Sequence, residues 1–316
     1  YTMPPKKAAA KGGKGAKKKE GDGPDVSVQM RRVKLEVNKV LQELQIPAEM
    51  ELDKLFITKF HDTLVGSTGK LLFQGDRPGV IGTQALSLIL RELCPIFVPV
   101  KTLCFWRCMV GDEGVKALCQ NCLYKKKMDQ HNWGGYQNLE LFDVRVSPRG
   151  CEYLSEQLAA NIPLVTLILD FNAIGDEGVM YLAEGLRTNS ELHTLSLCYC
   201  QIGPAGGAII GNEIIRCTQI RKLLLKGNRI MTEGLVAISR NLGKSKTLAE
   251  LDLSDNSILG AGPALNALCE ALRTNVSLHA VNLEVSLPNP CSPSATVCAS
   301  LMVCCARGTM QSSSPR

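Results

Sequence analysis

Part of this chain repeats itself every 28 residues, and an internal period of this length constrains the fold more than any other feature. The repeat reads Leu-x-x-Leu-x-Leu-x-x-Asn/Cys-x-Ile/Val, and a turn closed by a glycine follows each of its six copies. The six glycines are Gly114, Gly150, Gly178, Gly206, Gly234 and Gly262. Their spacings of 36, 28, 28, 28 and 28 residues indicate a row of equivalent units.

Each unit changes from the periodicity of a strand to that of a helix. In the third copy, Leu167 and Leu169 alternate along a short strand. Val179, Leu182 and Leu186 then follow at helical spacing. One unit cannot bury its apolar side alone, so the units must stack, with parallel strands on one side and helices on the other.

A polar or thiol side chain follows each strand at one fixed place in the repeat. Asn172, Asn228 and Asn256 occupy it in three copies, and Cys108 and Cys200 occupy it in two others. We expect the asparagines to hydrogen-bond the backbone of neighbouring turns. Several of the 14 cysteines fall at apolar or ladder positions of the repeat, which favours buried thiols in a reducing compartment over a disulfide framework.

The phrase Gly-Asp-Glu-Gly opens two of the helical runs. Asp112 and Asp176 stand there, where a carboxylate suits the free N–H groups and the positive dipole end of a helix. The phrase from Gly175 to Asn189, the strand pattern and the 28-residue step resemble the ribonuclease-inhibitor class of leucine-rich repeats, from about Val100 to Leu283.

The resemblance implies an α/β leucine-rich-repeat solenoid, a horseshoe with a concave parallel β-sheet and outer helices. The second copy departs from the pattern, because eight extra residues precede its strand and Val144 replaces the asparagine. We therefore expect a loop at Lys125 to Gly135.

The chain divides into four segments. Residues 1–25 form a disordered basic tail, and residues 26–98 a helical N-terminal cap that includes a candidate degenerate repeat around Leu71 and Phe73. Residues 99–284 hold about six repeats and a truncated seventh, and residues 285–316 form a non-repeat tail. Two helical stripes, one ending before Pro47 and one running from Leu52 to Leu64, indicate that the second segment caps the solenoid.

We interpret the last segment as a translated retained intron, because Val285 and Ser286 match the residues that a splice-donor sequence encodes. The natural protein would then continue with more repeats; a divergent tail is the alternative. Tyr1 and Thr2, before Met3, similarly suggest upstream read-through.

The net charge of +6 comes entirely from the first 20 residues. Their seven lysines make a salt-sensitive arm for a polyanion, such as the acidic tails of tubulin or another acidic surface. These residues are Lys6, Lys7, Lys11, Lys14, Lys17, Lys18 and Lys19. No aromatic residue interleaves them, so specific nucleic-acid recognition is not expected. No apolar run reaches the ~20 residues of a membrane helix, and no signal peptide opens the chain.

Candidate catalytic and metal-binding motifs fail on inspection. Gly66 to Lys70 faintly resembles a phosphate-binding loop but lacks its first glycine and its final Ser/Thr, so a plain loop is favoured. Cys119 and Cys122, with His131 nearby, have half the spacing of a zinc site. They align with the inward stripe of a helix, which favours core thiols. We expect no active site, no metal and no cofactor.

Surface is therefore the expected site of function. Trp106 and Phe142 are expected to project from the concave face as anchors for a protein partner, with Phe171 and Tyr199 completing a short aromatic row. The alternative is that the N-terminal helices or the 125–135 loop cover them. The other candidates on this face are Ile168, Asp170, Lys222, Lys226, Glu250 and Asp252. The two lysines can instead pair with the acids across neighbouring strands.

These features predict a non-enzymatic scaffold for protein–protein interaction. A basic arm joined to a short repeat array is similar to proteins of the ciliary or flagellar axoneme, which implies a cytoplasmic, microtubule-based assembly. The alternative is a GTPase-activating or GTPase-regulating protein of the same repeat class, for which Arg107 is the one basic candidate at the first strand's edge. An innate-immunity receptor would need an upstream nucleotide-binding domain, for which the first hundred residues are too short.

Overall fold

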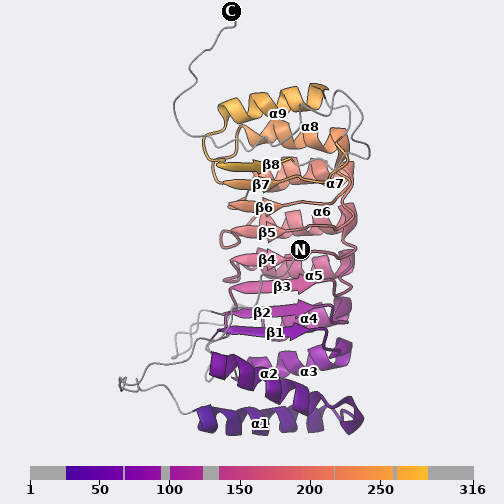
Figure 1. Ribbon diagram of the computed structural model, residues 1–316, viewed down its shortest axis with the longest axis vertical. Coiled ribbons are helices and arrows are strands. Elements are labelled where there is room, and N and C mark those ends of the chain that lie inside the picture. Colours follow the sequence, from indigo (N-terminus) through magenta and orange to yellow (C-terminus); the bar gives the residue numbers. More distant parts are fainter. Residues whose placement is uncertain are drawn as a thin grey trace, which may run out of the picture.

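The computed structural model describes residues 26–66, 68–93, 100–123, 135–216, 218–258 and 262–283. Over these residues the chain is an α/β solenoid in which strands and helices alternate along one axis (Figure 1). The predicted solenoid is confirmed. The lysine-rich tail, the segment after Leu283 and most of the predicted 125–135 loop lie outside the described residues.

Eight parallel strands form one sheet, and their order in the sheet is their order in the sequence. Equivalent leucines pair across the strands: Leu103 with Leu139, Leu139 with Leu167, and Leu167 with Leu195. The strands are β1 (Lys70–Gln74), β2 (Thr102–Trp106), β3 (Asn138–Phe142), β4 (Thr166–Ile168), β5 (Thr194–Ser196), β6 (Lys222–Leu224), β7 (Glu250–Asp252) and β8 (Ala280–Asn282).

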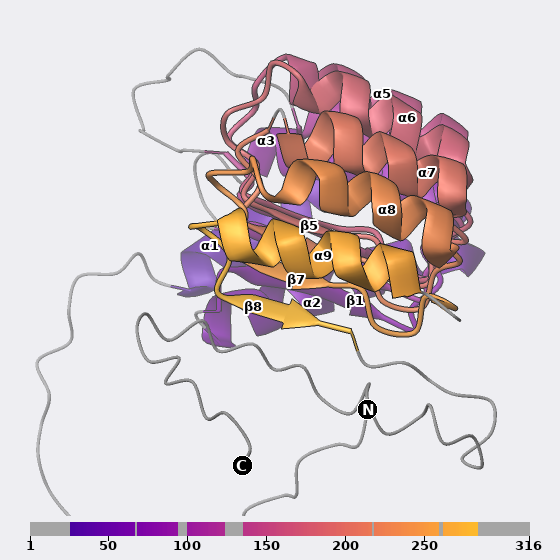
Figure 2. The same cartoon turned by 90° about the horizontal axis from the view of Figure 1, so that it is seen from above.

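The helices that follow the strands cover one side of the sheet (Figure 2). They are α3 (Gly79–Leu93), α4 (Gly111–Asn121), α5 (Pro148–Ala159), α6 (Gly175–Leu186), α7 (Pro204–Ile209), which continues into the π-helix η2 (Ile210–Ile215), α8 (Met231–Leu242) and α9 (Gly262–Thr274). Their apolar stripes and the strand leucines form one continuous core along the solenoid.

Two further helices and a short 3₁₀ turn precede the sheet at its β1 end (Figure 1). They are α1 (Val26–Glu43), η1 (Ala48–Met50) and α2 (Leu52–Gly66). Val37 of α1 and Phe56 of α2 are fully buried, and Phe56 meets Phe73 of β1 edge to face. Since Leu71 of β1 pairs in register with Leu103, β1 is a full member of the sheet.

Asn172, Asn228 and Asn256, which we call the asparagine rungs, each tie their unit to the one before it. The Asn172 Oδ1 accepts hydrogen bonds from the backbone N–H groups of Val144 and Val146, and its Nδ2 donates to the carbonyls of Leu141 and Leu169. Asn228 and Asn256 repeat this arrangement two and three units further on, beyond the intervening Cys200. The expected hydrogen bonding of these asparagines to neighbouring turns is therefore present.

Two further asparagines, which the repeat pattern alone does not mark, perform the same task where the chain enters β5 and β8. Asn189 donates to the Leu158 carbonyl and accepts from the backbone N–H groups of Glu191 and Leu192. Asn275 makes the equivalent bonds to the preceding unit and to its own turn. The available signal was an asparagine three residues before the first leucine of a repeat, as in Asn189 before Leu192 and Asn275 before Leu278.

The Gly-Asp-Glu-Gly carboxylates do not cap the helices that they open. Asp112 instead accepts hydrogen bonds from the backbone N–H and the hydroxyl of Ser147, the N-cap residue of α5. Asp176 accepts from the backbone N–H of Gly203, the N-cap residue of α7. Each carboxylate therefore joins two units, because the next helix begins beside it.

Helices α7 and α8 pack backbone against backbone at two glycines. A Cβ on Gly207 would lie 3.0 Å from the Gly234 Cα and 2.9 Å from Ile230. No side chain fits there without displacing a neighbour, so these glycines set how closely the two helices approach.

Candidate functional site

The candidate site lies on the side of the sheet opposite the helices. We call this side, which the repeat predicts to be concave, the open face. Along each strand, residues of the open face alternate with the buried leucines of the core. Figure 1 shows the strands that carry it stacked side by side from β1 to β8.

The open face is less exposed than its alternation predicts. Cys104 is only 2% exposed, and Ser196 and Ser254 are each 1% exposed. Neighbouring side chains cover them: Lys70 and Glu140 join over Cys104, whereas carboxylates bind the two serine hydroxyls. These three residues therefore offer almost no surface to a partner, although they stand at open-face positions of the repeat.

The four predicted aromatic anchors form two separate pairs. Trp106 and Phe142 end β2 and β3, and their ring centroids lie 5.3 Å apart at a 30° tilt. Phe171 and Tyr199 lie in the turns after β4 and β5 and stack face to face, with centroids 4.8 Å apart and an interplanar angle of 8°. Trp106 is 43%, Phe171 54% and Tyr199 37% exposed, so the helices α1 and α2 do not cover them.

Phe171 and Tyr199 belong to a row of residues with the same unusual backbone. The residue at this place in seven successive units has a φ between 50° and 72°, in the left-handed region. We call these residues the left-handed row: Gly75, Arg107, Asp143, Phe171, Tyr199, Gly227 and Asp255. The row marks where each strand from β1 to β7 turns away from the sheet.

The charged candidates are partly paired. Lys222 Nζ lies 2.6 Å from Glu250 Oε2 on the next strand, as predicted for a cross-strand pair. Asp252 accepts from the backbone N–H and hydroxyl of Ser254. Lys226 lies in the turn after β6 and is half-buried.

Asp170 is the most enclosed acid among the candidates. It accepts hydrogen bonds from the Ser196 hydroxyl at 2.6 Å and from the Cys198 backbone N–H at 2.9 Å. Burial raises the pKa of Asp170, although these hydrogen bonds oppose the increase. Its carboxylate therefore serves the turn after β5. Ile168, on the same unit, is half-buried beside it.

Arg107, the residue named for GTPase regulation, follows β2 in the left-handed row. Its Nε lies 3.5 Å from the Asp143 Oδ2 in the next unit, and its side chain is 74% exposed. This is a solvent-exposed ion pair between equivalent positions of two neighbouring units.

The sulfur chemistry is that of buried thiols. Burial raises the pKa of Cys119 to about 12, and Cys122 donates its S–H to the Ser87 carbonyl. The eight cysteines among the described residues are free, and no group of three His, Cys, Asp or Glu residues there could hold a metal ion. His131, the third residue of the candidate zinc motif, lies outside the described residues.

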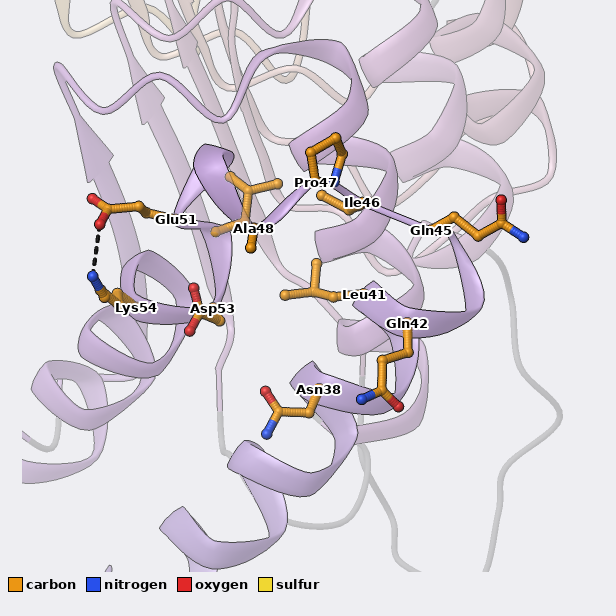
Figure 3. A pocket seen from close by; sticks show the side chains of 11 residues that line it. Asn38, Leu41, Gln42, Gln45, Ile46, Pro47, Ala48, Glu51, Asp53 and Lys54 are labelled. Carbon is orange, nitrogen blue, oxygen red and sulfur yellow. Dashed lines mark hydrogen bonds and ion pairs between the residues drawn. The ribbon is translucent and has the colours of Figure 1, made fainter.

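A pocket of about 420 Å³ lies in the helical segment that precedes the sheet, between the end of α1 and the start of α2 (Figure 3). Leu41 and Ile46 line it beside polar groups, and the exposed Glu51–Lys54 ion pair stands at one side (Figure 3). It holds no cluster of catalytic or metal-ligating groups.

The parallel sheet, the outer helices and the asparagine rungs define this chain as a leucine-rich-repeat protein. A family model described as Leucine Rich repeat matches residues 160–183, which span the strand β4 and the start of α6. Among solved structures, one that resembles the chain is "Leiomodin-1 Actin-Binding Site 2 (ABS2)". It is 22% identical, the match covers 42% of this chain and 78% of that one, and the TM-score is 0.37. No curated protein sequence matches.

None of the helices in the described residues combines the length and the apolar character needed to cross a membrane.

Proposed function

We propose that this protein is a non-enzymatic scaffold that binds another protein through the open face of its sheet. The observation that carries the proposal is the pair of aromatic contacts, Trp106–Phe142 and Phe171–Tyr199, left open to solvent on a rigid sheet. Aromatic side chains held in place by their neighbours lose little entropy on binding and are enriched at interface hot spots.

The rest of the open face supports binding rather than chemistry. Its acids and most of its basic groups make hydrogen bonds or ion pairs with neighbouring units, as in Lys70–Glu140 and Lys222–Glu250. A catalytic site needs a nucleophile or base with a perturbed pKa that can reach a substrate. Burial raises the pKa of the open-face thiols Cys104 and Cys198 to about 12 and about 11, so the unreactive thiol and not the thiolate is the favoured form at neutral pH.

We further propose that the scaffold works in a microtubule-based assembly of a cytoplasmic compartment, such as the axoneme of a cilium or flagellum. The lysine-rich arm at residues 3–19 supports this, since it would add a sequence-independent attraction to the acidic tails of tubulin. The free, buried thiols support a reducing compartment.

Cross-linking with mass spectrometry in the native cell tests the binding face. An amine-reactive cross-linker should join partner peptides to Lys222 and Lys226 on the open face, and the partners should include tubulin or proteins bound to it. Lys116 on α4 is the matched control on the helix side. Partner cross-links concentrated on Lys116, with Lys222 and Lys226 free of them, would exclude the open face as the binding surface.

A further inference from the structure

Three residues of the left-handed row, Arg107, Phe171 and Tyr199, have side chains that this backbone disfavours, and two of them are aromatic. A left-handed φ brings Cβ close to the following carbonyl, so glycine, asparagine and aspartate tolerate it and bulky residues rarely adopt it. Gly75, Asp143 and Gly227 follow this rule, whereas Phe171 with φ 61° and Tyr199 with φ 56° do not.

Burial does not explain why aromatic residues stand at these two positions. Phe171 is 54% exposed and Tyr199 37% exposed, so neither fills the core. Their rings instead stack on each other, and a Cβ on Gly227 would lie within 2.6 Å of the Tyr199 ring. The Tyr199 ring therefore occupies the space above Gly227. A stacked platform is held in a strained turn with one face towards solvent, and strain of this kind is concentrated at functional sites.

Two exposed arginines occupy equivalent positions in the repeat units before and after the platform. Arg145 follows Asp143 by two residues in the unit before Phe171, and Arg229 follows Gly227 by two residues in the unit after Tyr199. Both are exposed, and neither forms an ion pair with another residue in the described part of the chain. The nearby acids are engaged by contrast: Asp143 pairs with Arg107, and Asp170 binds Ser196 and Cys198. Asp255, one unit beyond Gly227, is an acid of the left-handed row that has no such partner among the described residues.

Resting on the function proposed above, we propose that the Phe171–Tyr199 platform is the hot spot and that it binds an acidic protein segment carrying one aromatic or large aliphatic side chain. That side chain would pack on the platform. The planar guanidinium groups of Arg145 and Arg229 suit carboxylates on either side of it, because they can form two parallel hydrogen bonds with each carboxylate. The binding centre is thereby placed at the third and fourth repeats rather than at Trp106 and Phe142.

The test uses the full chain at near-physiological salt and three labelled nonapeptides, with binding followed by fluorescence anisotropy. The first peptide has four glutamates on each side of a central phenylalanine. The second has glycine at the centre, and the third has glutamines in place of the glutamates. The first should bind at least ~10-fold more tightly than either of the others. The lysine-rich arm attracts the first two peptides equally, so it does not affect their ratio.

Three variants locate the binding. Phe171→Asn should weaken binding of the first peptide at least ~10-fold while leaving Tm unchanged or higher, because asparagine tolerates the left-handed backbone. The double variant Arg145→Gln/Arg229→Gln should weaken binding of the first peptide but not of the glutamine peptide, because the lysine-rich arm is unchanged. Met231→Asn is the matched control, since Met231 is also apolar, 41% exposed and left-handed with φ 55°, but lies at the start of α8. It should raise Tm without changing affinity.

Equal binding of the phenylalanine and glycine peptides would overturn this proposal. So would a Phe171→Asn variant that binds like Met231→Asn. If either result is obtained while partner cross-links still form at Lys226, the open face remains the binding surface and only the platform is excluded as its hot spot. Partner cross-links confined to the helix side would remove the proposed function itself.

Discussion

Lys70 Nζ lies 2.7 Å from Glu140 Oε2, although the two residues stand on β1 and β3 with the whole of β2 between them. The ion pair spans Cys104 and closes the open face above it. Burial lowers the pKa of Lys70, but the hydrogen bond and charge of Glu140 outweigh this effect and raise it. Burial raises the pKa of Cys104 to about 12, and the charge of Glu140 adds to the increase.

We predict that removing this cover makes Cys104 reactive. In the double variant Lys70→Ala/Glu140→Ala, the thiol should gain exposure and lose the carboxylate that raises its pKa, so its alkylation by iodoacetamide at pH 8 should be accelerated several-fold. The labelled peptide can be quantified by mass spectrometry over time. Cys119 provides the internal reference, because it lies beneath the helices and should remain unlabelled. A Cys104 rate equal to that of the unchanged protein would show that other side chains provide the cover.

Leu167 and Trp106 should respond in opposite ways to truncation. Leu167 is fully buried, so Leu167→Ala should cost about 2–5 kcal/mol of unfolding free energy through lost burial and a cavity. Trp106 is 43% exposed and makes one tilted ring contact, so Trp106→Ala should cost only ~0.5–1.5 kcal/mol. Urea denaturation of both variants decides the matter. If the two variants lose equal stability, Trp106 belongs to the core.

The asparagine rung should tolerate cysteine better than leucine. Asn172→Leu leaves the N–H groups of Val144 and Val146 and the carbonyl of Leu141 without partners, at a cost of about 3 kcal/mol or more. Asn172→Cys should cost less, because Cys200 at the same rung donates its S–H to the Leu169 carbonyl. Thermal unfolding of both variants gives the order, and a cysteine variant no more stable than the leucine variant would contradict it.

The lysine-rich arm should contribute to affinity only at low salt. Deleting residues 3–19 removes seven positive charges, whose attraction to an acidic partner is screened within about 10 Å at 0.1 M salt. Titration against tubulin, with and without the arm, should show a large difference in Kd at 20 mM salt and little at 300 mM. Loss of binding at every salt concentration would mean that the arm itself is a specific ligand.

Stimulation of GTP hydrolysis distinguishes the alternative function. We expect no acceleration of GTP hydrolysis by a panel of small GTPases, because Arg107 is engaged with Asp143 and no other basic group stands beside it in the left-handed row. Released phosphate is the readout. A stimulated rate that Arg107→Ala abolishes would replace the scaffold function with that of a GTPase regulator.

Period and alternation were sufficient to predict the architecture from the sequence. Leu167 follows the two-residue period of a strand and Val179 follows the spacing of a helix. The 28-residue step then places each of them beside the equivalent residue of the neighbouring unit. The hydrogen bonding of Asn172 could be predicted for the same reason, since a polar residue at a buried, repeated place must satisfy the backbone around it.

Contacts between units were harder to predict than contacts within one. Cys104 alternates as an exposed residue should, and only the reach of Lys70 and Glu140 across two strands buries it. Asp112 has the sequence position of a helix cap, yet Ser147 of the next unit lies nearer to its carboxylate. The aromatic residues form two pairs because Trp106 and Phe142 end their strands, whereas Phe171 and Tyr199 lie in the turns that follow theirs. The turn positions have left-handed φ values, which phenylalanine and tyrosine disfavour, so their residue types did not predict this backbone.

The glycine contact between α7 and α8 affects the curvature of the whole array. Backbone hydrogen bonds fix neighbouring strands at about 4.8 Å, whereas packed helices usually lie 8–10 Å apart, so a stack of such units bends into an arc. Gly207 and Gly234 let two helices approach more closely than side chains would allow, which flattens the arc beside β5 and β6. A single methyl group added on the convex side would therefore change the radius of the surface that a partner meets on the other side.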